Sequence, residues 1–373
     1  MKILFTTGRI HQIGGGAERS ATTLIRKLSE KHHVCVFNIV FEPQPEKNPG
    51  LIGSNIEIID WNFPIKTKKT LRMPYHARLL SCDIQAQREL NKIARNFQPE
   101  IVIAQKPPVV YEDPIPSNKA PIITFVRDTE YLDPFNIEHK CFIHYNTLFM
   151  KLRQKRMLKL LKKSNLLIVA SDFMREKLNG FGLSAEVVPP FIEFEKYASN
   201  PAGDRDSITM IAANLAKHKG VDIFLRIAEK CPDLKFLLVG RLPEEHGDLP
   251  SNVVHLRWTD DIKSILAKTM LLLVPSRWEE PFGRLPVEAG VNGIPSIASN
   301  RGGLVEAVGE GGILIQNYED IDLWVEAITS VLNNSAIYNS LSKNAIENAN
   351  RFEFCYSYAK FTSLVKEYFG IEL

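Results

Sequence analysis

The stretch MKILFTTGRIHQIGGGAERSATTLIRKL, residues 1–28, indicates the fold of this chain of 373 residues. Ile3–Thr7 is a short apolar run typical of a buried strand, and Gly14–Gly16 supplies a turn. Ala17–Lys31 then places apolar residues at helical spacing, namely Ala21, Leu24, Ile25 and Leu28. A strand, a glycine turn and a helix in this order predict the first unit of an α/β protein.

The same alternation continues through both halves of the chain. Apolar runs without period-two alternation, as expected for strands buried on both faces, are His33–Val40, Glu100–Ala104, Pro121–Val126, Leu166–Ala170, Ser207–Ala213, Leu234–Val239, Val253–Leu256, Met270–Val274 and Pro295–Ala298. Helix-period segments such as Val221–Lys230 lie between them. The pattern predicts two doubly wound, Rossmann-like α/β domains.

A chain of 373 residues suits two domains better than one. Tyr197–Asp204 is small and polar and contains a proline, which is typical of a linker. We therefore expect domains over residues 1–200 and 201–350. The tail Phe352–Phe369 repeats aromatic and aliphatic residues at helical spacing, so a packing helix is expected within residues 351–373.

The formal net charge of +3 is small for this length and gives no global field that would favour nucleic acid. Met1–Gly8 reaches turn residues too soon for a signal peptide, and no apolar run approaches the roughly 18 residues of a spanning helix. The five cysteines, Cys35, Cys82, Cys141, Cys231 and Cys355, are scattered without C-x-x-C spacing. We expect a cytoplasmic, reduced protein without structural zinc.

Gly14–Gly16 opens directly into a predicted helix, a geometry that exposes backbone N–H groups to an anion. The stretch is neither G-x-G-x-x-G nor a P-loop, because no Gly-Lys-Ser/Thr follows. Close approach of a ligand is one interpretation. A permissive turn between the first strand and helix is the other.

Ser276–Ser299 carries two acidic residues, Glu280 and Glu288, with seven residues between them. Pro281 suits the first position of a helix, and we expect Phe282 and Gly283 to present free N–H groups there. Glu288 lies in an apolar run, where a carboxylate needs a partner. The alternative is that Glu280 only complements the helix dipole while Glu288 faces solvent.

The segment PSRWEEPFGRLPVEAGVNGIPSIASNRGGLVEAVGEGGILI, residues 275–315, resembles the signature of the retaining glycosyltransferases of family four. Gly14–Glu18 resembles the glycine loop of that family, Ala170–Ser171 its helix start before the linker, and Lys219–Gly220 its phosphate-binding lysine. The resemblance implies the GT-B fold, with two Rossmann-like domains facing a central cleft. The N-terminal domain would bind acceptor, the C-terminal one nucleotide sugar, and the final helix would cross back to the first domain.

The resemblance also implies roles. Glu280 would hold the hydroxyls of the transferred sugar, Glu288 those of the ribose, and Lys219 would supply charge to the diphosphate. Carboxylates suit vicinal hydroxyls because they only accept hydrogen bonds. The implied donor-binding residues are Gly15, Gly16, Asn214, Lys219, Arg241, Pro281, Phe282, Gly283 and Glu288. For Lys219, a solvated lysine beside Lys217 and His218 is the alternative.

Asn214 departs from the family pattern, because an arginine usually stands five residues before the lysine. Arg241, after a predicted strand, or Arg301 could supply the missing charge, although each could equally be a solvated arginine.

The second departure is Arg127-Asp128, where the family commonly ends the strand with His-Asp. An arginine cannot shuttle protons at neutral pH, so Arg127 would act electrostatically with Asp128 as its orienting partner. A buried ion pair at a strand end is the alternative. Together with Glu280 these two residues form the expected catalytic set.

The expected activity is transfer of a sugar, with retention and without a metal, from a UDP- or GDP-linked donor to a glycan, lipid-linked or small-molecule acceptor. Asp204-Arg205-Asp206 and Asp320-Ile321-Asp322 do not follow strands, and the second opens a helix, where aspartates cap. No metal or cofactor is therefore expected. Rival interpretations are a sugar-nucleotide epimerase or a phosphorylase of the same architecture, and a non-catalytic sugar-binding protein.

Two segments of the N-terminal half, Lys66–Leu80 and Lys151–Ser164, mix cations with apolar residues. Both could contact an anionic membrane that carries a lipid-linked acceptor, at its inner face. An ordinary packing helix is the alternative for the second segment, and a mobile loop for the first.

Overall fold

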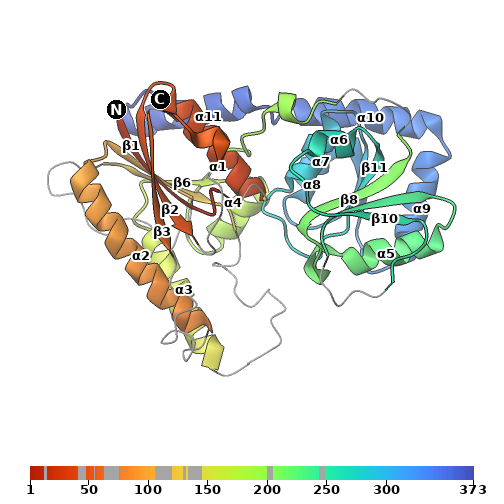
Figure 1. Cartoon of the computed structure of the whole chain (residues 1–373), viewed down its shortest axis with the longest axis horizontal. Coiled ribbons are helices and arrows are strands. Elements are labelled where there is room, and N and C mark those ends of the chain that lie inside the picture. Colours follow the sequence, from red (N-terminus) through yellow and green to blue (C-terminus); the bar gives the residue numbers. More distant parts are fainter. Residues whose placement is uncertain are drawn as a thin grey trace. The chain divides into compact units, whose positions relative to one another are not determined.

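The computed structural model describes residues 1–11, 15–40, 48–53, 55–62, 75–105, 120–128, 132, 145–199, 205–242 and 248–373. It divides into two compact units (Figure 1). Unit 1 consists of Met1–Val188 and Tyr358–Leu373, and unit 2 consists of Pro189–Ser357. Within the described residues, no helix is long and apolar enough to span a membrane.

Unit 1 contains a parallel sheet of seven strands in the order β3-β2-β1-β4-β5-β6-β7. Its strands are β1 (Lys2–Gly8), β2 (His33–Val40), β3 (Ile56–Asn62), β4 (Ile101–Ala104), β5 (Ile122–Val126), β6 (Leu166–Val169) and β7 (Glu186–Val187). Ile3, Leu4 and Phe5 of β1 are completely buried, so the strand is covered on both faces, as its uninterrupted apolar run predicted.

The helices of unit 1 are α1 (Gly16–Ser29), α2 (Tyr75–Phe97), α3 (Tyr145–Leu161), α4 (Asp172–Asn179) and α11 (Phe354–Phe369), of which α11 begins in unit 2. The predicted apolar face of α1, from Ala21 to Leu28, is buried. Ser171 caps α4 by accepting a hydrogen bond from the backbone N–H of Met174. Figure 1 shows α2 and α3 running alongside each other, and a buried ion pair between Arg153 and Asp83 joins them at 2.7 Å.

Unit 2 contains a parallel sheet of six strands in the order β10-β9-β8-β11-β12-β13. Its strands are β8 (Ser207–Asn214), β9 (Lys235–Arg241), β10 (Val253–Leu256), β11 (Thr269–Val274), β12 (Ser296–Ser299) and β13 (Gly312–Ile315). The prediction of two Rossmann-like parallel sheets is confirmed.

The helices of unit 2 are α5 (Val221–Lys230), α6 (Ile262–Leu266), α7 (Arg284–Gly290), α8 (Leu304–Val308), α9 (Ile321–Leu332) and α10 (Ser335–Asn350). Short 3-10 turns are η1 (Pro49–Leu51) in unit 1 and η4 (Phe194–Lys196), η5 (Lys217–Lys219) and η6 (Gly309–Gly311) in unit 2. The core joins α5, α9 and the strands, with Trp324 and Phe224 completely buried. Asp320 caps α9, as expected, by accepting from the N–H of Asp322.

The described cysteines, Cys35, Cys82, Cys231 and Cys355, are free thiols. Burial raises the pKa of Cys35 to about 12, with a small addition from Glu57. Cys141 and most of the expected linker, residues 200–204, lie outside the described residues.

Candidate functional site

The strand order of unit 2 reverses direction between β8 and β11, which are neighbours in the sheet. In open α/β sheets ligands bind at such a point, outside the carboxyl ends of the strands. The connection from β8 to α5 carries Lys219, and the connection from β11 to α7 carries Glu280. The order of strands therefore places both predicted residues at the reversal point of unit 2.

Gly220 brings these two connections into direct contact. It has a φ of +77°, and a Cβ added to it would lie 1.8 Å from the carbonyl oxygen of Pro275. Only glycine fits this approach without a shift of the backbone. Next to it, the carbonyl of His218 accepts the backbone N–H groups of Arg277 at 2.9 Å and Trp278 at 3.1 Å. The turn before α5 and the loop after β11 are thus joined through their backbones.

Lys219 and Glu280 form an ion pair across this junction. The ammonium of Lys219 lies 2.5 Å from Oε1 of Glu280. The hydroxyl of Ser276 donates to the same oxygen at 3.0 Å. Both side chains of the pair keep some exposure, 30% for Lys219 and 17% for Glu280. An accessible cation and an accessible acceptor of hydrogen bonds are therefore available at one point.

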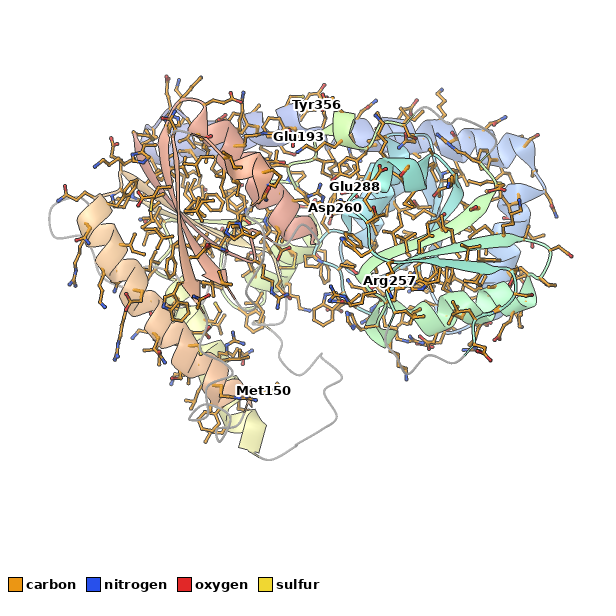
Figure 2. All side chains as sticks on the ribbon, in the orientation of Figure 1. Met150, Glu193, Arg257, Asp260, Glu288 and Tyr356 are labelled. Atoms are coloured by element: carbon orange, nitrogen blue, oxygen red, sulfur yellow. The ribbon has the colours of Figure 1, made fainter. Side chains whose placement is uncertain are left out.

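Glu288 lies in α7 and is 3% exposed (Figure 2). Its Oε1 is 3.0 Å from Nε of Arg284, one helical turn earlier, and Nη2 of Arg284 donates to the hydroxyl of Tyr197 at 3.0 Å. The interpretation in which Glu288 faces solvent is wrong, because the carboxylate is buried against this arginine. The expected need for a partner is met within the same helix.

Pro281 is not the first residue of a helix, contrary to expectation. α7 begins at Arg284, after Gly283 adopts a φ of +86° that breaks the helical path. Phe282 is buried, with its ring centroid 5.0 Å from that of Phe352. Pro281–Gly283 is therefore a turn before the helix. Pro286 occupies the third position of α7, where no N–H donor is lost from the helical ladder.

The turn between β12 and α8 packs on the backbone of Glu280. The N–H of Gly303 donates to the carbonyl of Glu280 at 2.7 Å, and a Cβ on Gly302 would lie 2.6 Å from that same oxygen. Of this turn, only Arg301 was expected to take part in the site, and the two glycines were not predicted. The paired glycines in Asn300–Gly303 were the available signal, because adjacent glycines often mark close backbone approach.

Asn214 and Arg241 are register partners at the carboxyl ends of β8 and β9. The N–H of Leu215 donates to the carbonyl of Arg241 at 2.9 Å, and the Arg241 side chain is exposed. Arg301, the other candidate for the missing charge, lies 5.5 Å from the ring centroid of Tyr318 and 4.0 Å from a carboxylate oxygen of Glu279. Of the two arginines, Arg241 is the direct cross-strand neighbour of Asn214.

In unit 1, Gly15 precedes α1 in an extended conformation and Gly16 begins the helix. Gly14 lies outside the described residues. A Cβ on Gly15 would lie 2.0 Å from Oε2 of Glu18, so the carboxylate of Glu18 folds back over this turn. A negative side chain at a helix N-terminus interacts favourably with the helix dipole.

Arg127 and Asp128 directly follow β5 and are partly buried. The guanidinium of Arg127 lies 4.7 Å from the ring centroid of Phe125, a cation–π geometry. Arg127 and Asp128 belong to unit 1, whereas Glu280, Lys219 and Glu288 belong to unit 2. Of these residues, Lys219 and Glu280 are in direct contact, and Glu288 pairs with Arg284.

Across the described ranges, no group of three or more His, Cys, Asp or Glu residues has a metal-binding arrangement. Asp206 pairs with Lys235 at 2.6 Å, and Asp204 lies outside these ranges.

The basic segment Lys151–Ser164 forms most of α3. Met157, Leu160 and Leu161 are buried in the core, as a packing helix requires, but Leu148 is 60% and Leu152 44% exposed. Of the other segment, residues 66–74 lie outside the described residues and Tyr75–Leu80 belongs to α2.

Two family models match the chain. The model described as Glycosyltransferase Family 4 matches residues 14–196, and the model described as Glycosyl transferases group 1 matches residues 193–350. Their boundary falls close to the division between units 1 and 2.

Curated relatives match more limited regions. Spore coat protein SA of Bacillus subtilis is 28% identical over 158 residues, which are 36% of this chain and 42% of that protein. D-inositol 3-phosphate glycosyltransferase of Mycobacterium sp. is 28% identical over 165 residues, 40% of this chain and 37% of that protein. The chain thus matches about two fifths of the length of these relatives.

Solved structures match the whole fold. Sucrose-phosphate synthase of Thermosynechococcus elongatus superposes with a TM-score of 0.78 at 15% identity, covering 99% of both chains. HepE of Anabaena in complex with UDP-glucose superposes with a TM-score of 0.73 at 17% identity, covering 98% of this chain and 100% of that one. Both family models describe glycosyltransferases, and together they match residues 14–350 of this chain, whose two Rossmann-like units have the GT-B fold of these solved structures.

Proposed function

We propose that this protein is a retaining glycosyltransferase that binds a nucleoside-diphosphate sugar on unit 2 and transfers its sugar to an acceptor without a metal ion. The observation that carries the proposal is the Lys219–Glu280 pair at the reversal point of the second sheet, with 2.5 Å between Nζ and Oε1. A diphosphate needs a cation and a sugar needs acceptors for its hydroxyls, and this pair offers both.

In the proposed complex Lys219 turns from Glu280 to the diphosphate, and Glu280 accepts hydrogen bonds from the hydroxyls of the transferred sugar. Lys219 then stabilises the negative charge that develops on the leaving diphosphate, a role for which many transferases use a divalent metal. Glu280 stabilises positive charge on the sugar. The leaving diphosphate assists removal of the acceptor proton on the same face of the sugar, which gives retention.

Glu288 binds the two hydroxyls of the ribose in this proposal. Its pairing with Arg284 supports that role, because a buried carboxylate held by a neighbouring cation is already oriented before ligand arrives. The backbone at Pro281, Phe282 and Gly283 approaches the sugar and diphosphate. Arg241 supplies, next to Asn214, the second phosphate charge of the family pattern.

Unit 1 is proposed to bind the acceptor. Gly15 and Gly16 remain proposed donor-binding residues, and Arg127 and Asp128, which follow β5, remain proposed catalytic residues. Arg127 acts electrostatically in this role because it stays charged at neutral pH. The crystal structure of HepE in complex with UDP-glucose supports testing uridine nucleotides first.

The acceptor is proposed to be presented at an anionic membrane through the α3 cationic face. This face consists of Leu148, Lys151, Leu152, Lys155, Lys159 and Lys162, all of which are exposed. Residues 145–163 contain no aspartate or glutamate, so nothing on this helix neutralises its charge. Exposed leucines among lysines suit a lipid surface, since the leucines enter the interface while the cations meet anionic headgroups.

Calorimetric titration of UDP, GDP and ADP in EDTA tests the proposal. One of the three nucleotides is expected to bind wild type with the chelator present. Glu288→Gln is expected to lower the affinity for that nucleotide about tenfold or more. Glu326→Gln, an exposed carboxylate of α9, is the matched control and is expected to leave affinity unchanged. Absence of binding, or binding that requires added Mg²⁺, contradicts the proposed site.

Retention is tested by NMR of the sugar released from an α-linked nucleotide sugar during the first turnovers. A product that appears first as the α-anomer supports retention, and an initial β-anomer contradicts it. Incubation of the donor without acceptor also separates the rivals, because an epimerase converts the nucleotide sugar itself while a binding protein leaves it unchanged.

A further inference from the structure

Arg277 belongs to the β11–α7 connection, which also carries Glu280, and it contacts the turn that carries Lys219. Its side chain is 14% exposed, and both of its terminal nitrogens and its Nε are engaged in hydrogen bonds. Nη1 and Nη2 donate to the two carboxylate oxygens of Asp222 at 2.6 and 2.8 Å, a bidentate pair with the first turn of α5. Nε and Nη2 donate to the carboxylate of Glu319, just before α9, with 3.0 Å for the Nη2 bond.

The same guanidinium also reaches the segment that contains Lys219. Nη1 donates to the carbonyl of Lys217 at 2.8 Å, and the backbone N–H of Arg277 donates to the carbonyl of His218 at 2.9 Å. Lys219 is the next residue along this turn, and Glu280 lies three residues after Arg277. Arg277 thus ties the loop that carries Glu280 to the turn that carries Lys219 through separate hydrogen bonds to Lys217 and His218.

We propose that Arg277 is a positioning residue that sets the separation of Lys219 and Glu280 by clamping the loop after β11 onto η5, α5 and the start of α9. The inference rests on the proposed function of the pair, but it concerns a residue that would contact neither nucleotide nor sugar. Its side chain is directed to Asp222 and Glu319, which are not among the proposed ligand-binding residues.

Arginine is specifically suited to this role. Its planar guanidinium presents N–H donors in fixed directions, which matches the two carboxylates and the one carbonyl found here. A lysine at the same place has three donors at a single nitrogen and cannot make both bidentate contacts. Arg277→Lys therefore keeps the charge and removes the fixed geometry.

The alternative is that the Arg277 cluster, which consists of Arg277, Asp222 and Glu319, only stabilises unit 2. A purely structural role would lower thermal stability, and it would affect ligand binding only as much as any comparable loss of stability does. The matched control is Arg205→Lys, because Arg205 is a partly buried arginine of the same unit that donates to the carbonyl of Asn292 at 2.8 Å. Both variants are expected to fold and to melt at a lower temperature than wild type.

The first measurement is an NMR spectrum of the ¹⁵N-labelled lysine ammonium groups in the full chain, with the Lys219 signal assigned by its loss in Lys219→Met. In wild type the ion pair is expected to slow proton exchange at Lys219 and make its signal visible. Arg277→Lys is expected to broaden or shift that signal, while Arg205→Lys leaves it in place. An unchanged signal in Arg277→Lys overturns the inference.

The second measurement is calorimetric binding of UDP, GDP and ADP in EDTA to the same variants. Arg277→Lys is expected to lower the affinity for the nucleotide about tenfold, and Arg205→Lys is expected to lower it less than about twofold. In the Lys219→Met background, Arg277→Lys is expected to have little further effect, because Arg277 acts through Lys219. Equal losses in both backgrounds, or in both arginine variants, overturn the inference.

These measurements separate the two proposals. If wild type binds no nucleotide, the proposed function fails, and the ammonium spectrum alone decides whether Arg277 positions Lys219. If nucleotide binds and Arg277→Lys changes neither readout, the positioning role fails while the proposed function stands.

Discussion

The ammonium of Lys219 lies 2.5 Å from Oε1 of Glu280, although 61 residues separate the two in the sequence. Each residue neutralises the other while no ligand is bound. A diphosphate and a sugar hydroxyl would then compete with the pair for its two members, so part of the binding free energy is spent on separating them.

Lys219→Met and Glu280→Gln are expected to have different effects. Lys219→Met removes the cation, so nucleotide affinity should fall about tenfold to a hundredfold. Glu280→Gln relieves Lys219 of its partner, so affinity for the free nucleoside diphosphate should hold or rise, while kcat should fall about a hundredfold or more because charge on the sugar is no longer stabilised. Calorimetry and initial rates check this. A parallel loss of nucleotide affinity in both variants would argue against the division of roles.

Arg241→Ala is expected to weaken nucleotide binding about tenfold, because Arg241 is the cross-strand neighbour of Asn214. Introducing the family's arginine with Asn214→Arg should restore affinity in the Arg241→Ala background. Affinity titrations of the two single variants and the double variant check the compensation. If the Arg241→Ala variant binds nucleotide as tightly as wild type, Arg241 does not supply the second phosphate charge.

Glu288→Gln is expected to be tolerated by the fold better than Glu288→Leu. The amide keeps a hydrogen-bond acceptor near Arg284, whereas leucine leaves that arginine buried beside an apolar side chain, at a cost of about 3–5 kcal/mol. Arg284→Met combined with Glu288→Leu should recover part of the loss. Urea denaturation checks the order of the stabilities of these variants. A Glu288→Leu variant as stable as Glu288→Gln would show that the Arg284–Glu288 pair does not contribute to folding stability.

Acid should destabilise unit 2 through the Arg277 cluster. Burial alone would raise the pKa of Asp222, but hydrogen bonds and charge from Arg277 outweigh it and hold the pKa below its ordinary value. Hydrogen bonds from Arg277 likewise lower the pKa of Glu319. Because both folded pKa values lie below the unfolded ones, this stabilisation is full above about pH 4.5 and is lost as pH falls through the folded values.

Glu319→Gln should therefore lose less stability than wild type between about pH 5 and pH 2.5. The urea midpoint followed by tryptophan fluorescence is a suitable readout, since Trp258, Trp278 and Trp324 belong to unit 2. Glu326→Gln is the control and should follow wild type. If the urea midpoints of Glu319→Gln and wild type depend on pH in the same way, the Arg277 cluster is not the cause of the loss of stability in acid.

The α3 cationic face is expected to bind vesicles that contain anionic lipid and not vesicles of phosphatidylcholine alone. Lys151→Glu combined with Lys155→Glu should reduce binding by about tenfold or more, because each lysine near such a surface contributes about 1 kcal/mol. Vesicle sedimentation at two salt concentrations checks this. Lys177→Glu on α4 is the control for a lost cation elsewhere on unit 1. Equal binding to neutral vesicles, or loss in the control, would contradict the membrane contact.

Local sequence determined the strands and helices to a large extent. Continuous apolar runs predicted strands such as β1, β8 and β9 because residues buried on both faces of a parallel sheet have no polar side. β3 was missed because its exposed side chains, such as Glu57 and Asp60, interrupt the apolar pattern. β7 has two residues, and β13 begins at the second of two adjacent glycines, Gly311 and Gly312, so neither gives a periodic signal.

The sequence pointed to individual candidate residues, but not to the contacts between them. The spacing of Glu280 and Glu288 along the chain drew attention to α7. Arg284 lies four residues before Glu288, a spacing that allows a pair on one helix, but this pair was not predicted, and neither were the contacts of Arg277. Pro281 was expected at the first position of a helix because a backbone N–H has no helical partner there, so the N–H that proline lacks is not missed. Gly283 has a positive φ, so the helix begins only after it. The sequence shows that this residue is a glycine, which can adopt such a φ, but it does not show that the glycine does so.

By itself the sequence determined most of the segments that form strands and helices, because periodicity and turn chemistry act between residues close along the chain. Only the tertiary structure decided which residues of distant segments meet. The order β10-β9-β8-β11-β12-β13 brings the ends of β8 and β11 together and so joins Lys219 to Glu280 and Asn214 to Arg241. Those contacts depend on strand order and register, which are set by the packing of the whole sheet.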